Sequence, residues 1–475
     1  MERMSGIDAG FLYMEAPTLH MHTIKVAVLD LAPGADYSPA GIRTAMQARI
    51  HLLPPFRRRV VEVPFGIHHP VWVDDPAFDL DHHLRRVVLP PPGGPRQLDA
   101  VVSEIASTPL DRRRPLWELS IVEGLAGGRI AAVAKIHHAV ADGVAVAELL
   151  ANVMSPDPAA VVAACAVSWC TPPLPSRTQL LRDAVRDRLR LLWRLPRLAA
   201  TTLRNLRATA RHRRAARLAP PLPILHAPRT SFNGSLTARR RFASVSLSLD
   251  EIKTIKRAFD VTVNDVLLAL VAGTLRRYLA ARGETPDRPL VAEVPISTDR
   301  PGDPRRLAGN RVANVFTSLC TDVDDPAERL RRIHDCMQAG KELNQVLGPQ
   351  LFRDWTEYTP PRLFTWIVRQ YARWRIADLL PPTINVIVSS VPGPRQPLYW
   401  AEGHLHELYS VGPIVDGVGL NVTAWSYCDR LNVGLLSCPD RLAALDEVAD
   451  GLQAALAELL HAAAPQSAPR ACGQG

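Results

Sequence analysis

The sequence contains no uninterrupted apolar run long enough to cross a bilayer as a helix, which needs about 20 residues. One of the longest runs, Ala159–Cys170, suits a buried or interfacial segment. The N-terminus, Met1–Gly10, contains Glu2 and Asp8 and lacks the apolar core of a secretory signal. We therefore expect a cytoplasmic protein without a transmembrane helix.

Several chemical signatures are also missing. The seven cysteines are odd in number and form no CxxC pair, which argues against a disulfide framework or a zinc site and fits a reducing compartment. Neither GxGxxG nor GxxxxGK[ST] occurs, so a dinucleotide fold and a P-loop are excluded. No GxSxG elbow is present, and no cysteine lies in a nucleophile motif. The sequence therefore does not predict a covalent acyl-enzyme.

The length and composition suit two globular domains. The chain has 475 residues, and 47% are hydrophobic and 22% charged, which is enough apolar material for packed cores. The 42 prolines lie mostly between periodic segments. We divide the chain into a first half (residues 1–160), a basic helical linker (161–235), a second half (236–465) and a disordered tail (466–475).

Both halves alternate strand and helix periodicity. The expected strands are His22–Asp30, Phe56–Val63, His68–Asp74, Leu116–Glu123, Arg129–His137, Phe242–Leu249, Leu290–Ile296, Val312–Val323, Thr383–Ser390, Leu405–Val411, Gly419–Tyr427 and Leu431–Cys438. The expected helices are Pro39–Leu52, Gln97–Ser107, Gly143–Met154, Val263–Arg282, Ala327–Leu343 and Leu442–Ala463. The glycines between Leu116–Glu123 and Arg129–His137 predict a hairpin. These patterns indicate two mixed α/β halves.

One segment makes the protein basic. The net charge is +9, whereas Arg177–Arg217 alone contains 13 arginines and two aspartates, and the rest of the chain is therefore slightly acidic. Leucines recur at three- and four-residue steps around Trp193, which predicts a basic amphipathic helix broken at Pro196. An anionic membrane or lipid-droplet surface suits this pattern. A solvated linker helix is the alternative, and nucleic-acid binding is disfavoured because no reading module accompanies the charge.

The sequence His137-His138-Ala-Val-Ala-Asp142-Gly143 lies where a strand is expected to end and a helix to begin. Strand alternation sends His137 and His138 to opposite sides, so that one can enter a cleft while the other packs behind it. Histidine can remove a proton from an alcohol near neutral pH. Asp142 can cap the helix or bind a distant arginine, and Gly143 allows a close backbone approach. A purely structural pair remains an alternative; a metal site is disfavoured because no third ligand is evident.

The HHAVADG sequence matches the HHxxxDG motif of coenzyme A-dependent acyltransferases of the chloramphenicol acetyltransferase-like superfamily. The chain as a whole resembles the bacterial wax ester synthase/diacylglycerol acyltransferase family, and its actinobacterial members in particular. The matching pieces are Asp8–His22, Val63–Arg86, Pro109–Arg129, Val261–Leu279, Gly309–Phe316, Asn385–Tyr399 and Gly412–Tyr427.

The resemblance implies an α/β (α+β) fold of two similar halves, each a mixed sheet flanked by helices, with an active-site tunnel between them. It implies that His138 is the general base and that Asp142 has a structural role. Further residues match family motifs: Pro115, Leu116 and Trp117 (packing or acyl-chain lining), Asn264 and Asp265 (at a helix start, where Asn264 could be only an N-cap), and Asn385, Ser389 and Ser390 (either serine an oxyanion donor or only a strand end).

The implied activity is transfer of a long acyl chain from acyl-CoA to diacylglycerol, giving triacylglycerol, or to fatty alcohols, giving wax esters. We expect acyl-CoA as co-substrate, held by arginines and backbone, and neither a metal nor a permanently bound cofactor. Three alternatives stay open. The first is a related enzyme that esterifies a polyketide or another lipid alcohol. The second is a glycerol-phosphate acyltransferase, whose HxxxxD pattern the same letters satisfy, although the second-half matches argue against it. The third is a non-catalytic lipid-surface protein.

Overall fold

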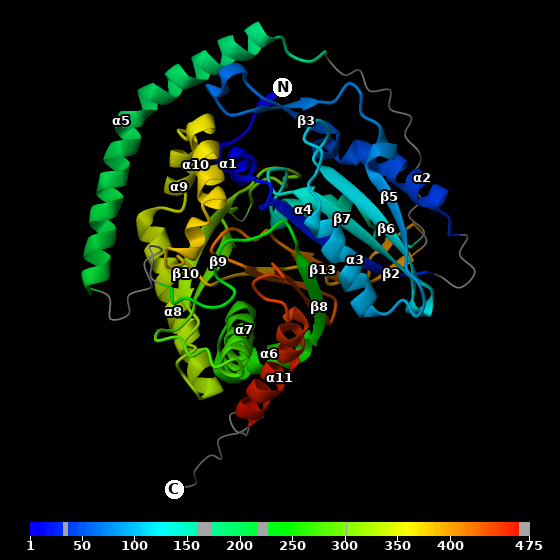
Figure 1. Cartoon of the computed structure of the whole chain (residues 1–475), viewed down its shortest axis with the longest axis vertical. Coiled ribbons are helices and arrows are strands. Elements are labelled where there is room, and N and C mark those ends of the chain that lie inside the picture. The colour runs from blue at the N-terminus through cyan, green and yellow to red at the C-terminus, as the bar shows by residue number, and fades with distance from the viewer. Residues whose placement is uncertain (32–36, 159–172, 216–226, 301, 402, 465–475) are drawn as a thin grey trace.

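The computed structural model describes residues 1–31, 37–158, 173–215, 227–300, 302–401 and 403–464. Ala159–Cys170 and the predicted disordered tail at 466–475 lie outside the described residues. Two six-stranded sheets and one small three-stranded sheet form the framework (Figure 1). Helices flank the large sheets, so the predicted mixed α/β architecture is confirmed.

The first large sheet is built mainly from the first part of the chain. Its strands follow the order β12 (Tyr399–Trp400), β13 (Gly403–Val411), β2 (His22–Leu31), β7 (Arg129–His137), β6 (Trp117–Leu125) and β5 (Leu84–Val88). Strands β6 and β7 form the predicted hairpin. Its turn requires glycine because Gly127 and Gly128 both adopt positive φ angles. Helices α2 (Pro39–Arg49) and α4 (Gly143–Val153) pack on one face of this sheet, and α3 (Pro95–Ser107) packs on the other.

Strand β13 comes from the second part of the chain but pairs with β2 of the first sheet. The two strands are antiparallel, with Tyr409 opposite Val26. The division into residues 1–160 and 236–465 remains a prediction, and the sheet order shows that the second range contributes two strands to the first sheet. The contribution of these two strands ties the two large sheets together.

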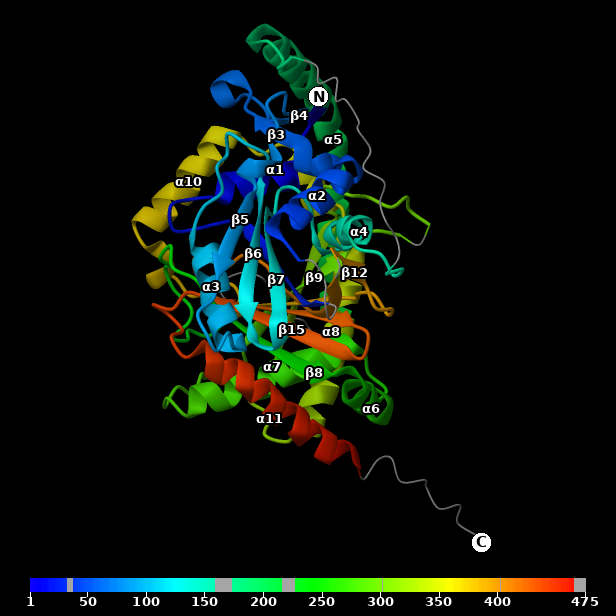
Figure 2. The same ribbon diagram turned by 90° about the vertical axis from the view of Figure 1, so that its right-hand side faces the viewer.

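The second large sheet has the order β10 (Val312–Ser318), β9 (Val291–Ser297), β11 (Val386–Val391), β14 (Leu420–Tyr427), β15 (Arg430–Ser437) and β8 (Arg241–Ser248). Its apolar face is covered by α6 (Leu249–Phe259), α7 (Val263–Ala280), α8 (Pro326–Leu347) and α11 (Leu445–Ala463). These four helices gather at one end of the molecule (Figure 2). The opposite face of this sheet is turned toward the first sheet, since β14 and β15 contact β13.

Helix α5 (Arg177–Ala215) runs unbroken through Pro196, so the predicted break at that residue is wrong. Proline removes one backbone donor, and on this largely exposed helix the freed carbonyl can be hydrated. The helix lies along the outside of the molecule (Figure 1). It is attached by an ion pair between Arg3 and Asp187 at 3.1 Å and by a hydrogen bond from Asn205 to the Leu347 carbonyl at 2.9 Å.

Other elements had no sequence prediction. They are α1 (Gly6–Met14), α6, α9 (Leu351–Thr356), α10 (Pro361–Arg373), β5, β12 and β1 (Glu2–Arg3), the last of which joins β4 (Val71–Asp74) and β3 (Arg58–Val61) in the small sheet. Among the described residues, no single helix is long and apolar enough to span a bilayer. One pair, α6 with α7, reaches that length and composition only together, across a bend of 101°.

Candidate active site

His138 is the first residue after β7. Its backbone N–H donates to the carbonyl oxygen of Met21 at 2.7 Å, next to the start of β2. Its ring stacks on Phe11 of α1, with ring centroids 4.2 Å apart and an interplanar angle of 24°. The side chain is half-buried, and its Nδ1 atom is fully buried and has no hydrogen-bond partner among the described residues. The ring is thus held by packing and backbone, which leaves Nε2 as the nitrogen available to a reactant.

His137 lies on the opposite side of the strand and is completely buried. Its Nδ1 atom accepts a hydrogen bond from the Ala139 N–H at 3.1 Å, so the proton of the neutral ring is on Nε2. Burial lowers the pKa of His137 to about 3, and the ring is therefore neutral at physiological pH. Its Nε2 lies 3.8 Å from Oε1 of Glu15. His137 is placed to pack behind the site rather than to meet a reactant.

Asp142 fixes the backbone that follows the two histidines. Its Oδ1 atom caps α4 by accepting from the N–H groups of Val144 and Ala145 at 3.1 and 3.0 Å. Its Oδ2 atom accepts from Nη2 of Arg306 at 2.6 Å and from the N–H of Arg311 at 2.8 Å. The buried carboxylate therefore has four donors, two from each side of the junction between the halves, and none of its bonds reaches His138 directly.

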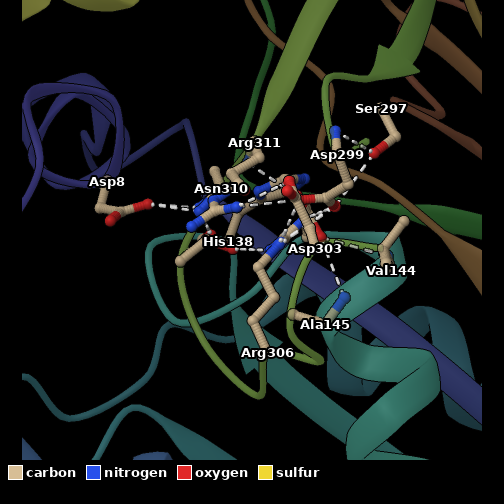
Figure 3. A network of polar contacts seen from close by, with 12 residues as sticks. Asp8, His138, Val144, Ala145, Ser297, Asp299, Asp303, Arg306, Asn310 and Arg311 are labelled. Carbon is tan, nitrogen blue, oxygen red and sulfur yellow. Dashed lines mark hydrogen bonds and ion pairs between the residues drawn. The ribbon is translucent and has the colours of Figure 1, made fainter. Parts of the chain in front are cut away.

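The segment around Gly309 and Asn310 connects this carboxylate to His138 (Figure 3). Gly309 has a φ of +79° and exchanges backbone hydrogen bonds with the motif, its N–H donating to the Val140 carbonyl at 2.8 Å. The side-chain amide of Asn310 donates to the His138 carbonyl at 2.8 Å and to Oδ1 of Asp8 at 2.7 Å. Burial raises the pKa of Asp8 to about 6. The His138 backbone is therefore held from both α1 and the second half.

Arg306 anchors the same segment. Its Nη2 atom bridges Asp142 and Oδ2 of Asp299, which lies 2.8 Å away, and its Nη1 atom donates to the Gly309 carbonyl at 2.7 Å. Planar guanidinium groups suit such a bridge between two carboxylates. This arginine is the distant partner that the sequence suggested for Asp142 without naming it.

A buried lysine faces the same side of the first sheet as His138. Lys25 on β2 donates to the Ser410 hydroxyl on β13, and its Nζ atom lies 5.0 Å from the centre of the Trp425 ring. Burial lowers the pKa of Lys25 to about 7. Burial also lowers the pKa of His138, an effect that the Asp142 carboxylate opposes and the Lys25 ammonium reinforces. A neutral imidazole is the form that a general base requires.

The end of β11 brings the second sheet to the motif. A Cβ atom added at Gly143 would lie 3.0 Å from Cγ2 of Val391, so a larger residue would press on this strand. Ser389 is on the same face of β11 as Val391, whereas Ser390 is on the face of Val388, which belongs to the helix-covered core. Of the two predicted serines, Ser389 is the one on the side of the motif. Neither hydroxyl contacts His138 in the described structure.

The PLW segment has a packing environment. Pro115, Leu116 and Trp117 are all buried. The indole N–H of Trp117 donates to the Phe56 carbonyl at 2.7 Å, and its ring stacks on Phe56 and on His83, with centroids 4.7 and 4.5 Å away. Of the two roles expected for this segment, the structure favours packing.

The ND pair lies at the start of α7, but Asn264 is not its N-cap, which removes the alternative role that the sequence left open for this residue. The cap is Thr262, whose hydroxyl accepts from the Asp265 N–H at 3.2 Å, while Asp265 accepts from the Thr262 N–H at 2.9 Å. Thr262 occupies the N-cap position because the helix begins at Val263, so that Asn264 is already its second residue. Asp265 also contacts Nδ1 of His334 at 2.8 Å. Asn264 itself is half-buried.

Asn385 is a buried connector. Its Oδ1 atom accepts from the Val291 N–H at 2.9 Å, and its amide donates to the Pro228 carbonyl and to Oδ1 of Asn233, both at 2.7 Å. It thus ties the start of β11 to β9 and to the segment before β8. The structure gives it no contact with the His138 region.

No role was predicted from the sequence for Asp8, Phe11, Lys25, Arg306 or Asn310. Three of them, Asp8, Phe11 and Asn310, lie in pieces that match the family. Their proximity to His138 could not be predicted, because only the tertiary fold brings α1 and residue 310 together there. The sequence does carry a signal for Lys25, because this charged residue lies between the apolar residues Ile24 and Val26 of the predicted strand.

A histidine at the end of a buried strand, followed by a capping aspartate and by a glycine that approaches a second sheet, is typical of the HHxxxDG class of two-halved acyltransferases. The chain belongs to the wax ester synthase/diacylglycerol acyltransferase family. The family's catalytic-domain model matches residues 4–267, and its C-terminal-domain model matches residues 308–460. The resemblance seen in the sequence is therefore confirmed.

Known proteins are similar along nearly the whole chain. A Mycobacterium tuberculosis H37Rv protein, itself named only provisionally as a diacylglycerol O-acyltransferase, is 40% identical over 98% of this chain and 97% of its own length. The solved wax ester synthase/diacylglycerol acyltransferase of Marinobacter aquaeolei VT8 has a TM-score of 0.69 and 29% identity, over 98% of this chain and all of that one. The starter condensation domain of rhizomide synthetase, solved with C8-CoA and Leu-SNAC, shares the fold, with a TM-score of 0.55 at 13% identity over 98% of this chain and 94% of its own.

Proposed function

We propose that this acyltransferase moves a long acyl chain from acyl-CoA to the free hydroxyl of diacylglycerol, giving triacylglycerol, and that fatty alcohols are secondary acceptors that give wax esters. Family membership supports the reaction class. The observation that supports the assignment of the base is the setting of His138, whose ring stacks on Phe11 and whose Nδ1 is buried, which leaves Nε2 as the nitrogen available to a reactant.

The reaction is a direct transfer. Nε2 of His138 takes the proton of the acceptor hydroxyl while the hydroxyl oxygen attacks the thioester carbonyl carbon. When the C–O bond has formed, the C–S bond breaks, and the imidazolium returns its proton to the departing thiolate, which yields the ester and free coenzyme A. A thiol has a pKa of about 8.5, so the leaving group needs little assistance. Asp142, Arg306 and Asn310 act as positioning residues.

The negative charge that develops on the carbonyl oxygen needs a donor. Ser389 is the candidate among the predicted residues because it shares the face of β11 with Val391, which contacts the motif at Gly143. Lys25 offers a second candidate from the opposite sheet, since its side chain is buried on the His138 side.

Acyl-CoA is the co-substrate in this proposal, and neither a metal nor a permanently bound cofactor takes part. Within the described ranges, no group of three or more His, Cys, Asp or Glu side chains could hold a metal ion. We further propose that the enzyme is cytoplasmic and peripherally bound to the inner face of the plasma membrane or to lipid droplets. The arginines of α5, within Arg177–Arg217, supply the attraction to an anionic surface.

The test is turnover by purified protein with labelled acyl-CoA, offered diacylglycerol and hexadecanol in parallel. We expect triacylglycerol as the main product and a fall of about 10²–10⁴-fold in rate for His138→Ala, with an unchanged circular dichroism spectrum. His137→Ala is the control and should lose less, because that ring packs behind the site. Full activity without His138, or equal losses at the two histidines, would show that the base is assigned wrongly.

A further inference from the structure

Helix α10 has two apolar faces, and only one of them packs against the protein. The inner face includes Phe364, whose ring lies 6.4 Å from that of Tyr13 on α1, and Val368, which packs against the cluster around α1. The outer face contains Leu363, Trp366 and Ile367 at the three- and four-residue spacing of one helical stripe, which continues past Gln370 to the C-cap residue Trp374. We call this stripe the α10 face.

The α10 face is exposed to a degree that is unusual for such residues. Trp366 is 56% exposed and Trp374 61% exposed, and Leu379 and Leu380 just beyond the helix are exposed as well. Figure 2 shows α10 along an outer edge of the molecule, with none of the described elements outside it. Contiguous exposed apolar surface of this kind marks an interaction site.

The exposed apolar residues are not scattered over the molecule. Apart from Met1, Phe65, Val88 and Leu174, every large apolar side chain that is exposed in the described part of the chain lies on α5 or between Phe352 and Leu380. Phe65 also lies near this surface, because a Cβ atom added at its neighbour Gly66 would be 2.9 Å from Cγ of Arg362 at the start of α10. The surface therefore extends from the Phe65 turn along α10 to Leu380.

The charges on helix α10 itself are of one sign. Arg362, Arg369 and Arg373 follow one another along one side of the stripe, and all three are exposed. The helix contains no acidic residue. An apolar stripe with interfacial tryptophans and a row of arginines matches the boundary between acyl chains and anionic headgroups.

The α10 face lies close to His138 in the fold, which relates this surface to the delivery of substrate. The inner face of α10 contacts Tyr13 of α1, and Phe11 of the same helix stacks on the His138 ring. One helix therefore separates the α10 face from the catalytic base. Helix α5 is attached at other places, through α8, α9, the N-terminus and the Ile67 carbonyl, by contacts such as the bond from Trp355 to Thr202 at 2.9 Å and that from Arg188 to Ile67 at 2.8 Å.

We propose that the α10 face inserts into an anionic lipid surface and is the apolar anchor of the enzyme, while the arginines of α5 supply only long-range attraction. This inference rests on the proposed function for its purpose, but the binding it describes is measured without turnover. A lipid acceptor would then leave the interface one helix away from His138.

The experiment is flotation with vesicles of phosphatidylcholine alone and of phosphatidylcholine mixed with phosphatidylglycerol, at low and high salt. The test variant is Leu363→Ser/Trp366→Ser/Ile367→Ser. The matched control is Leu189→Ser/Leu192→Ser/Trp193→Ser on α5, which also removes one tryptophan and two aliphatic side chains from exposed positions. We expect the α10 variant to lose at least about tenfold in vesicle partition at high salt, where attraction between charges is screened, and the α5 control to stay near wild type.

Three results would overturn the proposal. One is loss of salt-resistant binding by the α5 control but not by the α10 variant. Another is unchanged binding by both variants. The third is a wild-type dimer in light scattering that the α10 variant converts to monomer with vesicle binding intact, which would make this face a contact between two copies. Turnover of a long-chain acyl-CoA and diacylglycerol dispersed in non-ionic detergent, free of vesicles, should be equal in all three proteins. Its failure in the wild type would contradict the proposed function and leave the vesicle result standing.

Discussion

Asp142→Asn tests whether this residue holds the site together or takes part in the chemistry. The substitution keeps an oxygen for the cap of α4, but it replaces Oδ2 with an NH₂ group that faces two donors, the Arg306 guanidinium and the Arg311 N–H. Two charge-assisted hydrogen bonds are lost in a buried setting, each worth about 1.5–3 kcal/mol. We expect the free energy of unfolding to fall by about 3–5 kcal/mol.

Activity should fall with stability in this variant, because the segment that carries Asn310 and supports the His138 carbonyl loses its anchor. Urea unfolding followed by tryptophan fluorescence gives the first quantity, and kcat/KM gives the second. Asp299→Asn is the matched control. It makes the same change of charge beside Arg306, but its side chain is 20% exposed whereas that of Asp142 is 2% exposed, so the loss should be no more than about 1 kcal/mol. Wild-type stability combined with absent turnover in Asp142→Asn would refute this reasoning and give Asp142 a direct catalytic role.

Two further predictions concern pH. Burial raises the pKa of Asp8 from its usual 3.8 to about 6, so that the folded protein keeps a proton which the unfolded chain has released. The stabilisation from this group is complete below pH about 4 and is lost as the pH rises to about 6. In Asp8→Asn, the free energy of unfolding from urea titrations should lack this fall of about 3 kcal/mol across the range. Parallel curves for the two proteins would contradict the prediction. Lys25→Met removes a cation that lowers the pKa of His138, so the acid limb of the kcat/KM profile should move to higher pH. A limb that stays in place would show that the two groups do not interact.

Local patterns were sufficient for most of the framework. The hairpin of β6 and β7 and the strand–helix junction at His138 were predicted within a residue or two, because apolar alternation and turn glycines are encoded locally. The break predicted at Pro196 of α5 was wrong, because proline is tolerated inside a helix where the freed carbonyl can be hydrated. Helix α1 was missed although Ser5 caps it, because its residues carry little helical periodicity.

In the candidate site, too, some residues could be predicted from the sequence and others could not. The motif residues could be named from sequence because their chemistry and spacing are contiguous. The partners of Asp142 could not, since Arg306 lies 164 residues away and only the packing of one half on the other brings it into contact. For Asn264 the sequence left a cap role open because its residue type favours helix caps, but Thr262 caps α7 and Asn264 is the second residue of the helix.

The pairing of β13 with β2 has a consequence for how the protein is made. While a ribosome synthesises the chain from its N-terminus, β2 emerges early but its second edge stays open until Gly403–Val411 has left the exit tunnel. During that interval an apolar strand presents unpaired backbone groups, which can template association with other chains. Most of the chain must therefore be synthesised before the first sheet can be completed. If the two halves were expressed as separate fragments, each would need the other to pair the open edge of β2.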